Sequence, residues 1–442
     1  METPEPALVV FIPFVSFHRL YNKTMRLLKA LCFIALFFLC GMGFRYLLID
    51  DTESYTRLMM HEFYAQDQID VLFTGSSHCY ASLDPSVTDA GLGVNTFNAG
   101  SALQALDASF ALIREGVERK QVRRVFLEMY YVMMANDEYK EREQMTGTYI
   151  VSDYMRPSLN KVRFLLEASS PEYYVNSFLP ARRNWEGLLH PEEIRHLLMK
   201  KGTAAYRNFL PFDDYKGKGF ASGQGRIGGG LLLDTAGFDR IHMESPSADW
   251  LRTLRDILDY CEKKGVELTL FSAPMTLFQT AGVGNYDEYI ALIRSLTEGT
   301  DVRYWDFNLC REQWFDQTPD LFEDAGHLNA GGSERFSRVF ADFFSGEIAP
   351  EELFYGSMAE KIAAHGADIL GLSYLDSGDR MRKLKIVSAM PEGTRFTAVL
   401  VREDGSTETL LDREPELFFE IPQDVHGTVR IEAEGISAEI GV

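Results

Sequence analysis

The feature that most limits the fold of this chain is a regular alternation of short apolar stretches and amphipathic stretches between residues 70 and 344. The apolar stretches lack a polar face, which is typical of strands buried on both sides of a parallel sheet. The stretches between them carry apolar residues at helical spacing and predict crossover helices. This order predicts an α/β fold of the flavodoxin-like type, with three layers and about five parallel strands. The expected strands are 70–75, part of 93–100, 123–130, 266–274 and 302–308, and the expected helices are 102–120, 247–265, 286–299 and 331–344.

Residues 138–246 interrupt the alternation and are predicted to be an insertion after the third strand. Helical patterns occupy 158–170 and 190–202, and a glycine-rich loop occupies 213–230. An insertion that follows the carboxyl end of a strand can serve as a lid or as a substrate platform. A helical buttress without a ligand is the other reading, and the sequence leaves both open.

The C-terminal part of the chain has a different character. Beyond residue 347 comes one further helical stretch, and residues 378–442 contain short β-branched stretches separated by turn signals. The sequence EDGS at 403–406 is typical of a hairpin turn. We therefore expect a small all-β module at residues 378–442.

An apolar stretch near the N-terminus predicts a membrane anchor. Residues 27–49 are 23 residues, long enough to cross a bilayer with Lys29 and Arg45 reaching outward. Basic residues precede the stretch and acidic residues follow it, which predicts a cytoplasmic N-terminus and an extracytoplasmic main domain. A cleaved signal peptide is the alternative, but no small-x-small cleavage site follows, so an uncleaved anchor is favoured. The flanking basic residues are Arg19, Lys23 and Arg26, and the flanking acidic residues are Asp50, Asp51 and Glu53.

These patterns divide the chain into four parts. The expected parts are a cytoplasmic tail (1–26), a transmembrane signal-anchor (27–49), an α/β domain (60–346) that contains the insertion 138–246, and a C-terminal region with the β module (347–442).

The composition argues against several classes of function. With 44 basic and 65 acidic residues the net charge is −21, so nucleic acid is not an expected partner. The five cysteines show neither metal-ligand spacing nor a disulfide framework. His190 and His196 are six residues apart and lie on different faces of any helix. We therefore expect no metal and no nucleotide cofactor.

The candidate site residues follow strands or precede the last helix. In open α/β sheets, sites form outside the carboxyl ends of the strands. A serine becomes a nucleophile when a histidine takes its proton, and a carboxylate on the other ring nitrogen orients that histidine. Backbone N–H groups at the serine and at a glycine can receive the oxyanion. The residues that fit these roles are Ser77 in Gly75-Ser76-Ser77, Asn98 and Gly100 in 97–101, and Asp324 and His327 in 323–332.

The joint pattern of "GSS", "NAG" and "DAGHLNAGG" resembles the SGNH (GDSL-type) hydrolase superfamily. It is more closely similar to the membrane-anchored envelope branch, which includes the teichoic-acid D-alanylation and alginate acetylation proteins. The likeness covers roughly residues 69–140 and 247–345. The resemblance implies that Ser77 is the nucleophile, His327 the base and Asp324 its orienting carboxylate. It also implies that the N–H groups of Ser77 and Gly100 form the oxyanion hole.

One block of that family pattern is missing. A Gly-x-Asn-Asp motif should follow the third strand and supply an oxyanion-hole asparagine, but Tyr130, Tyr131 and Val132 stand there. Asn136 comes several residues late. Either a bulged loop brings Asn136 in, or Asn98 or a tyrosine hydroxyl replaces it, or the site has lost strength.

The expected function follows from the triad and the anchor. It is a membrane-anchored serine esterase or O-acyltransferase acting on an acyl ester of an envelope glycan or teichoic acid. A membrane-bound O-acyltransferase as partner would point to transfer rather than hydrolysis. The alternative is a non-catalytic envelope assembly or binding protein that keeps the fold. His78, which follows the nucleophile, is predicted to point away from the site in a structural role.

Overall fold

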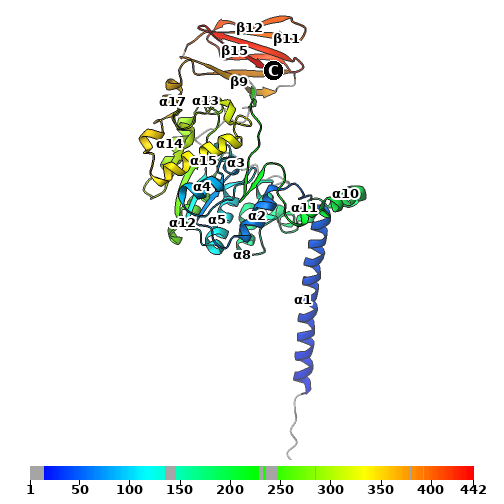
Figure 1. Ribbon diagram of the computed structural model, residues 1–442. Coiled ribbons are helices and arrows are strands. Elements are labelled where there is room, and N and C mark those ends of the chain that lie inside the picture. Colours follow the sequence, from blue (N-terminus) through cyan, green and yellow to red (C-terminus); the bar gives the residue numbers. More distant parts are fainter. Residues whose placement is uncertain are drawn as a thin grey trace, which may run out of the picture. The chain divides into compact units, whose positions relative to one another are not determined.

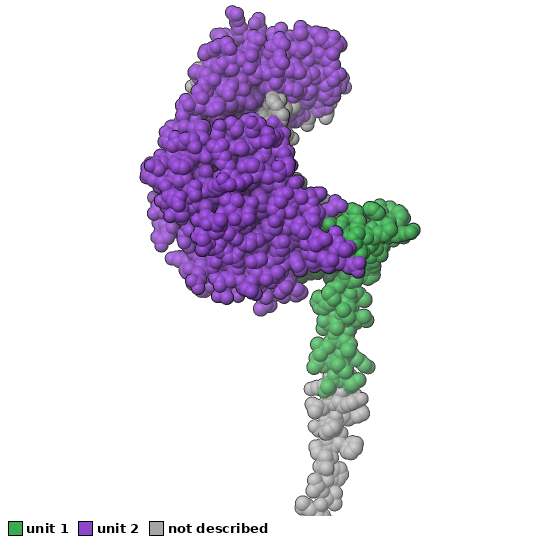
Figure 2. Space-filling model, viewed as in Figure 1, with its two compact units in different colours: residues 1–52, 178–203 green, residues 53–177, 204–442 purple. Residues whose placement is uncertain are grey.

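The computed structural model describes residues 14–134, 146–227, 232–234, 246–283, 285–377, 380–391 and 393–442. These residues form two compact units (Figures 1 and 2). The first unit is Met1–Thr52 with Phe178–Thr203, and the second is Glu53–Ser177 with Ala204–Val442. The second unit holds the sheet and all the candidate site residues within the described ranges.

A five-stranded sheet organises the second unit (Figure 1). Its strand order is β2-β1-β3-β7-β8, and every neighbouring pair is parallel. The predicted parallel sheet is therefore confirmed, with each strand shorter than the expected stretch. The strands are β1 (Val71–Thr74), β2 (Thr96–Asn98), β3 (Arg124–Glu128), β7 (Glu267–Ser272) and β8 (Arg303–Asp306).

Successive strand residues point into two separate apolar cores, which makes three layers. Leu72 and Val125 belong to a core with helices α5 (Leu106–Lys120), α12 (Ala248–Lys264) and α14 (Tyr286–Leu296). Phe73 and Phe126 belong to the opposite core, where they pack against the aromatic face of α15 (Ala330–Ser345). This double burial explains why the strands read as continuous apolar stretches. The remaining helices of this unit are α2 (Tyr55–Ala65), α3 (Ser77–Ser82), α4 (Pro85–Leu92), α7 (Thr146–Ser152), α8 (Leu159–Ala168), α9 (Tyr174–Phe178, whose last residue belongs to the first unit), α11 (Ala204–Arg207), α13 (Leu277–Gly282), α16 (Pro350–Leu353) and α17 (Met358–His365).

The C-terminal region consists of two four-stranded sheets around their own apolar core. The sheet orders are β13-β10-β9-β6 and β12-β11-β14-β15. The expected hairpin at EDGS is confirmed, because the Arg402 N–H donates to the Ser406 carbonyl at 2.9 Å between β11 and β12. The strands are β9 (Ile369–Ser377), β10 (Met381–Ser388), β11 (Phe396–Arg402), β12 (Thr407–Glu414), β13 (Phe418–Pro422), β14 (Gly427–Ala433) and β15 (Ile436–Gly441).

The expected boundary of the β module is wrong in two respects. The module begins with β9 at Ile369, not at residue 378. It also takes up β6 (Leu232–Asp234) from the insertion, which pairs in parallel with β9. The three residues of β6 are too few to show an alternation of apolar and polar side chains. In β9, the glycine and the serine obscure that alternation. Only the pairing partner identifies either segment as a strand.

The insertion is split between the two units. Its expected helical stretches are confirmed as α8 and α10 (Pro191–Lys201). The glycine-rich segment begins with a short hairpin, β4 (Tyr215–Gly217) and β5 (Phe220–Ala221), in the second unit. Residues 178–203, including α10, form a compact unit with the N-terminal helix instead.

The N-terminal helix α1 runs from Phe14 to Leu48. Its part Thr24–Leu48 is 25 residues, long and apolar enough to span a membrane, and none of its most apolar stretch is buried. The predicted apolar helix is therefore confirmed, with an end one residue before the expected limit at residue 49.

Candidate active site

The nucleophile turn follows β1 directly. Ser76 has extended backbone and caps α3, since its hydroxyl accepts the His78 N–H at 3.2 Å. Ser77 is the first residue of α3, and its side chain is half-buried. The capping role falls on Ser76, which leaves the Ser77 hydroxyl available for chemistry.

Gly75 makes this turn possible. Its φ of +156° and its closeness to β3 exclude a side chain, because a Cβ would lie 2.5 Å from the Cβ of Glu128. The chain therefore passes β3 closely enough for the turn to bond with Glu128.

The structure brings together the three residues predicted to form a triad. The Ser77 Oγ lies 2.7 Å from the His327 Nε2, although the two residues are 250 positions apart. The His327 Nδ1 lies 2.9 and 3.0 Å from the two carboxylate oxygens of Asp324. With Nδ1 donating to the carboxylate, Nε2 is free of its proton and can accept the serine hydrogen. This is the geometry of an activated serine.

The loop that carries Asp324 and His327 is held from two sides. The Thr276 N–H and hydroxyl both donate to the Ala325 carbonyl, at 3.0 and 2.8 Å. On the insertion side, the Ser222 hydroxyl donates to the Leu328 carbonyl at 3.1 Å. Sequence reasoning missed these supports, because the residues that provide them carry no motif. The glycine-rich segment is therefore a brace for the loop that carries Asp324 and His327.

The environment of Asp324 favours its ionised form. Partial burial acts to raise its pKa, but the hydrogen bond and charge of His327 outweigh that effect. The backbone N–H groups of Gly326 and His327 also donate to its Oδ1, each at 2.8 Å. The pKa of Asp324 therefore lies well below its ordinary value, so the carboxylate is available to a protonated His327.

The prediction that His78 points away from the site is wrong. Its ring stacks on the ring of His327, with centroids 4.5 Å apart and planes 17° apart, and its other neighbour is Tyr130 at 4.0 Å. Burial lowers the pKa of His78 well below its ordinary value, helped by the nearby His327. A neutral imidazole thus packs against the catalytic one and limits its rotation.

Glu128 is the main site residue that sequence reasoning missed. It ends β3, is 5% exposed, and its Oε2 accepts the Ser76 N–H at 2.9 Å and the Ser76 hydroxyl at 2.8 Å. Burial raises its pKa to about 7 against the lowering effect of these two bonds. The available signal was a carboxylate in the otherwise apolar stretch RRVFLEMY. Glu128 positions the residue next to the nucleophile.

We expect Glu128→Gln to remove a pH dependence of stability. The folded chain resists ionising this carboxyl, so its contribution to the free energy of unfolding falls as the pH rises from about 4.5 to about 7. The loss amounts to about 3 kcal/mol. Glutamine keeps an acceptor for Ser76 and cannot ionise, so the variant should lose less stability across this range. Thermal midpoints of the full chain at pH 5 and pH 8 measure the difference.

Glu267→Gln is the matched control, because that carboxylate is 60% exposed. It should leave the difference between the two pH values as in the wild type. Equal differences in the wild type and in Glu128→Gln would contradict the role given to Glu128.

Of the expected oxyanion donors, the Ser77 N–H is the one without an acceptor among the described residues. The Gly100 N–H already donates to the Asn98 Oδ1 at 3.0 Å. The Asn98 amide donates to the carbonyls of Cys79 and Leu83, both at 2.9 Å, and its side chain is fully buried. Asn98 therefore ties α3 to the end of β2, and its amide is not directed at the nucleophile.

The other two expected donors are Asn136 and a tyrosine hydroxyl. Asn136 lies outside the described residues. Tyr130 packs against His78, with its ring centroid 5.0 Å from that of Tyr131. Among the described residues, the site thus has one donor without an acceptor, the Ser77 N–H, and one donor that already has an acceptor, the Gly100 N–H.

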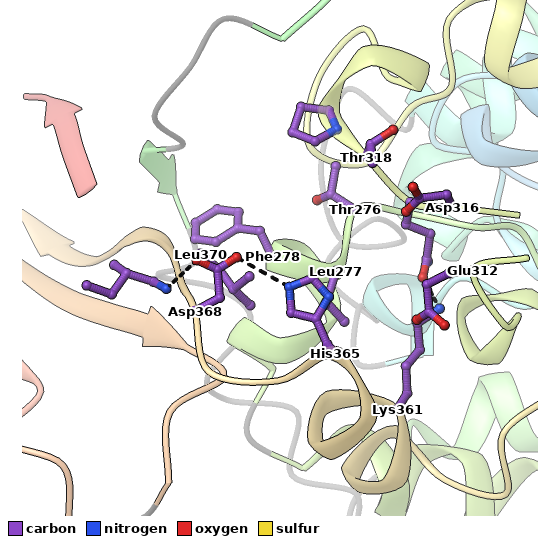
Figure 3. Close-up of a pocket in the computed structure, with 13 residues that line it drawn as sticks. Thr276, Leu277, Phe278, Glu312, Asp316, Thr318, Lys361, His365, Asp368 and Leu370 are labelled. Atoms are coloured by element: carbon purple, nitrogen blue, oxygen red, sulfur yellow. Dashed lines mark hydrogen bonds and ion pairs between the residues drawn. The ribbon is translucent and has the colours of Figure 1, made fainter. Parts of the chain in front are cut away.

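Two cavities adjoin this machinery. A cavity of about 160 Å³ is lined by Gly100 and by Tyr80, which lies one turn along α3 from Ser77. A second cavity of about 280 Å³ is lined by Thr276, the residue that holds the catalytic loop, and by His365 and Asp368, whose side chains are 3.3 Å apart (Figure 3). No triad residue lines either cavity, but the first is lined by Gly100, one of the expected oxyanion donors.

The described residues contain no group of three or more His, Cys, Asp or Glu side chains that could hold a metal ion. No protein-family model matches the sequence, and no curated protein matches it either. The function must therefore be argued from the geometry of the site.

Proposed function

We propose that the chain is a membrane-anchored, extracytoplasmic serine esterase or O-acyltransferase of the SGNH type. One observation carries the proposal, which is the hydrogen-bonded series of Ser77, His327 and Asp324 with Nε2 2.7 Å from Oγ. The series joins Ser77, which follows β1, to the loop that precedes α15, in the order expected from the sequence, which supports a common site.

The reaction proceeds in two halves. The Ser77 oxygen attacks the ester carbonyl while its proton passes to the His327 Nε2, and the carbonyl oxygen becomes an oxyanion. Collapse of this intermediate breaks the ester bond, and the leaving alcohol takes the proton from His327. Water or an acceptor hydroxyl then gives its proton to His327 and attacks the acyl-Ser77. The bond between the acyl group and the Ser77 oxygen then breaks, and that oxygen takes the proton back from His327. The products are a free acid or a new ester, and the enzyme is regenerated.

The first hydrogen-bond donor to the oxyanion is the Ser77 N–H. The Gly100 N–H becomes a second donor when its bond is divided between the Asn98 Oδ1 and the substrate. Each such donor is worth about 10²–10³ in rate in other serine enzymes. A site with one free and one shared donor is therefore slower than one with two free donors.

The substrate class follows from the anchor and the charge. The spanning helix keeps the domain near an envelope surface, and a net charge of −21 disfavours nucleic acid. An acylated envelope glycan, teichoic acid or lipid-linked saccharide fits these conditions. The cavity of about 160 Å³ beside Gly100 suits a short acyl group.

Covalent labelling tests the proposal. The full-length chain in detergent is treated with a fluorophosphonate and digested, and the peptide with Ser77 is examined by mass spectrometry. We expect one phosphonate on Ser77 and hydrolysis of p-nitrophenyl acetate by the unlabelled chain. A chain that neither reacts nor hydrolyses this ester would refute the enzymatic proposal.

A specific observation favours a second function. The bond between the Gly100 N–H and Asn98 leaves the oxyanion hole incomplete, as in a protein that binds acylated glycan without turning it over. Such a protein would keep the fold and the cleft, and it would bind a glycan ester without releasing acid.

A further inference from the structure

The 178–203 segment of the insertion is fastened to the end of α1, with which it shares one unit (Figure 2, green). Lys201, 1% exposed, lies within 3.0 Å of the Asp51 carboxylate. Its ammonium also donates to the carbonyls of Tyr46 and Ile49, at 3.0 and 2.5 Å. The last carbonyl groups of a helix have no hydrogen-bond donor within the helix, and here a buried lysine is the donor.

A second donor reinforces this attachment. The Asn184 side-chain amide donates to the Leu48 carbonyl at 3.1 Å. Leu48 is also the last residue of the apolar part Thr24–Leu48 that is long enough to span a membrane. The segment is therefore held at the level where the spanning stretch ends, which is the level of the lipid headgroups.

The exposed apolar side chains of the chain gather in this part of the sequence. Outside α1, thirteen large apolar side chains of the described residues are exposed, and eleven of them lie between residues 159 and 210. Scattered exposed apolar residues need no explanation, whereas a contiguous exposed apolar patch marks a binding surface. Six of the eleven belong to the segment: Phe178, Trp185, Leu188, Leu189, Leu198 and Met199.

The charge of the segment permits contact with lipid headgroups. It contains five basic and three acidic residues, so its net charge is +2, whereas the whole chain carries −21. Lys200 and Lys201 are paired with Asp50 and Asp51, which brings the local balance to about zero. The excess negative charge of the chain lies elsewhere, so this surface avoids the repulsion that an anionic bilayer would exert on the rest.

We propose that the 178–203 segment docks on the bilayer surface, with its exposed apolar side chains in the interfacial layer. Tryptophan at the end of a spanning helix is typical of that layer, and Trp185 is 46% exposed. The most exposed large apolar side chain of the segment is Leu189, at 69%. The lipid bilayer is the occupant, because the segment is bonded to the helix that enters it. The proposal rests on the membrane anchoring proposed above.

Fluorescence quenching by brominated lipid tests the docking. The full-length chain is placed in nanodiscs of lipid brominated close to the headgroup and, separately, in unbrominated nanodiscs. We expect bromination to quench part of the emission of the wild type and Trp185→Phe to lose most of that quenching. Trp314→Phe is the matched control, because Trp314 is a half-buried tryptophan of the other unit, and it should keep the quenching of the wild type.

A second variant covers the case in which Trp185→Phe alters the segment. Leu189→Trp in the Trp185→Phe background should restore the quenching. Equal quenching in the wild type and Trp185→Phe, without a gain in the double variant, would overturn the docking. A segment that meets a protein partner instead would give that same result.

The outcomes separate the docking from the other proposals. Release of the chain from membranes by alkaline carbonate would overturn the anchoring and the docking together. Retention without quenching from Trp185 would overturn the docking alone. The quenching should be the same in Ser77→Ala, so the failure of the enzymatic proposal leaves this one standing.

Discussion

Ser77→Ala should abolish ester hydrolysis and covalent labelling by a fluorophosphonate. The Ser77 oxygen is the only protein atom that forms a bond to the acyl group in the proposed reaction. Removal of the nucleophile from a serine protease triad lowers kcat by about 10⁶-fold, and we expect a loss of that order here. Single-turnover hydrolysis of p-nitrophenyl acetate by the full-length chain measures it, with labelling as the second readout.

Ser76→Ala is the matched control for the nucleophile. Ser76 caps α3 and bonds to Glu128, so its loss should cost about 1 kcal/mol of stability while Ser77 is still labelled. If Ser76→Ala lost the label and Ser77→Ala kept it, the nucleophile would be the other serine. If both variants kept full activity, hydrolysis would arise elsewhere in the chain.

His327→Ala should cost nearly as much as the loss of Ser77, because no other ring nitrogen lies at hydrogen-bond distance from the nucleophile among the described residues. Triad members act as a unit, so the expected loss is again about 10⁶-fold in kcat. The double variant Ser77→Ala, His327→Ala should be no slower than either single variant. Added imidazole should restore part of the activity of His327→Ala by occupying the vacated space.

His78→Phe distinguishes between the two stacked imidazoles. Phenylalanine keeps an aromatic ring against His327 and Tyr130 and removes any proton acceptor. We expect this variant to retain most of the activity. The opposite pattern, an inactive His78→Phe and an active His327→Ala, would move the general base to His78.

The fold could be predicted where burial leaves a mark on the local sequence. Each strand of the parallel sheet is buried on both faces, and helices α12 and α14 are each buried on one, so continuous apolar stretches identified the five strands and helical spacing identified these helices. No local sequence pattern indicates the strand order β2-β1-β3-β7-β8. No local pattern identified β6 as a strand either, because its three residues become a strand only by pairing with β9.

The candidate site divides in the same way. The sequence could predict Ser77, Asp324 and His327 as site residues. Their residue types and their places beside strand ends and a helix start are local properties of the sequence. The sequence could not predict the role of Glu128, the stacking of His78 on His327 or the support from Ser222. Each depends on a distance between segments that are far apart in sequence.

The sequence by itself therefore determined the N-terminal helix that is long and apolar enough to span a membrane, the alternating sheet, and the residues able to act as nucleophile, base and orienting acid in the proposed reaction. Tertiary structure alone decided that Oγ and Nε2 meet at 2.7 Å, that Asn98 occupies the Gly100 N–H, and that part of the insertion is bonded to the anchor helix. The physical reason is the range of the interactions. Periodicity and capping act within a few residues, whereas these contacts form only after packing has brought distant segments together.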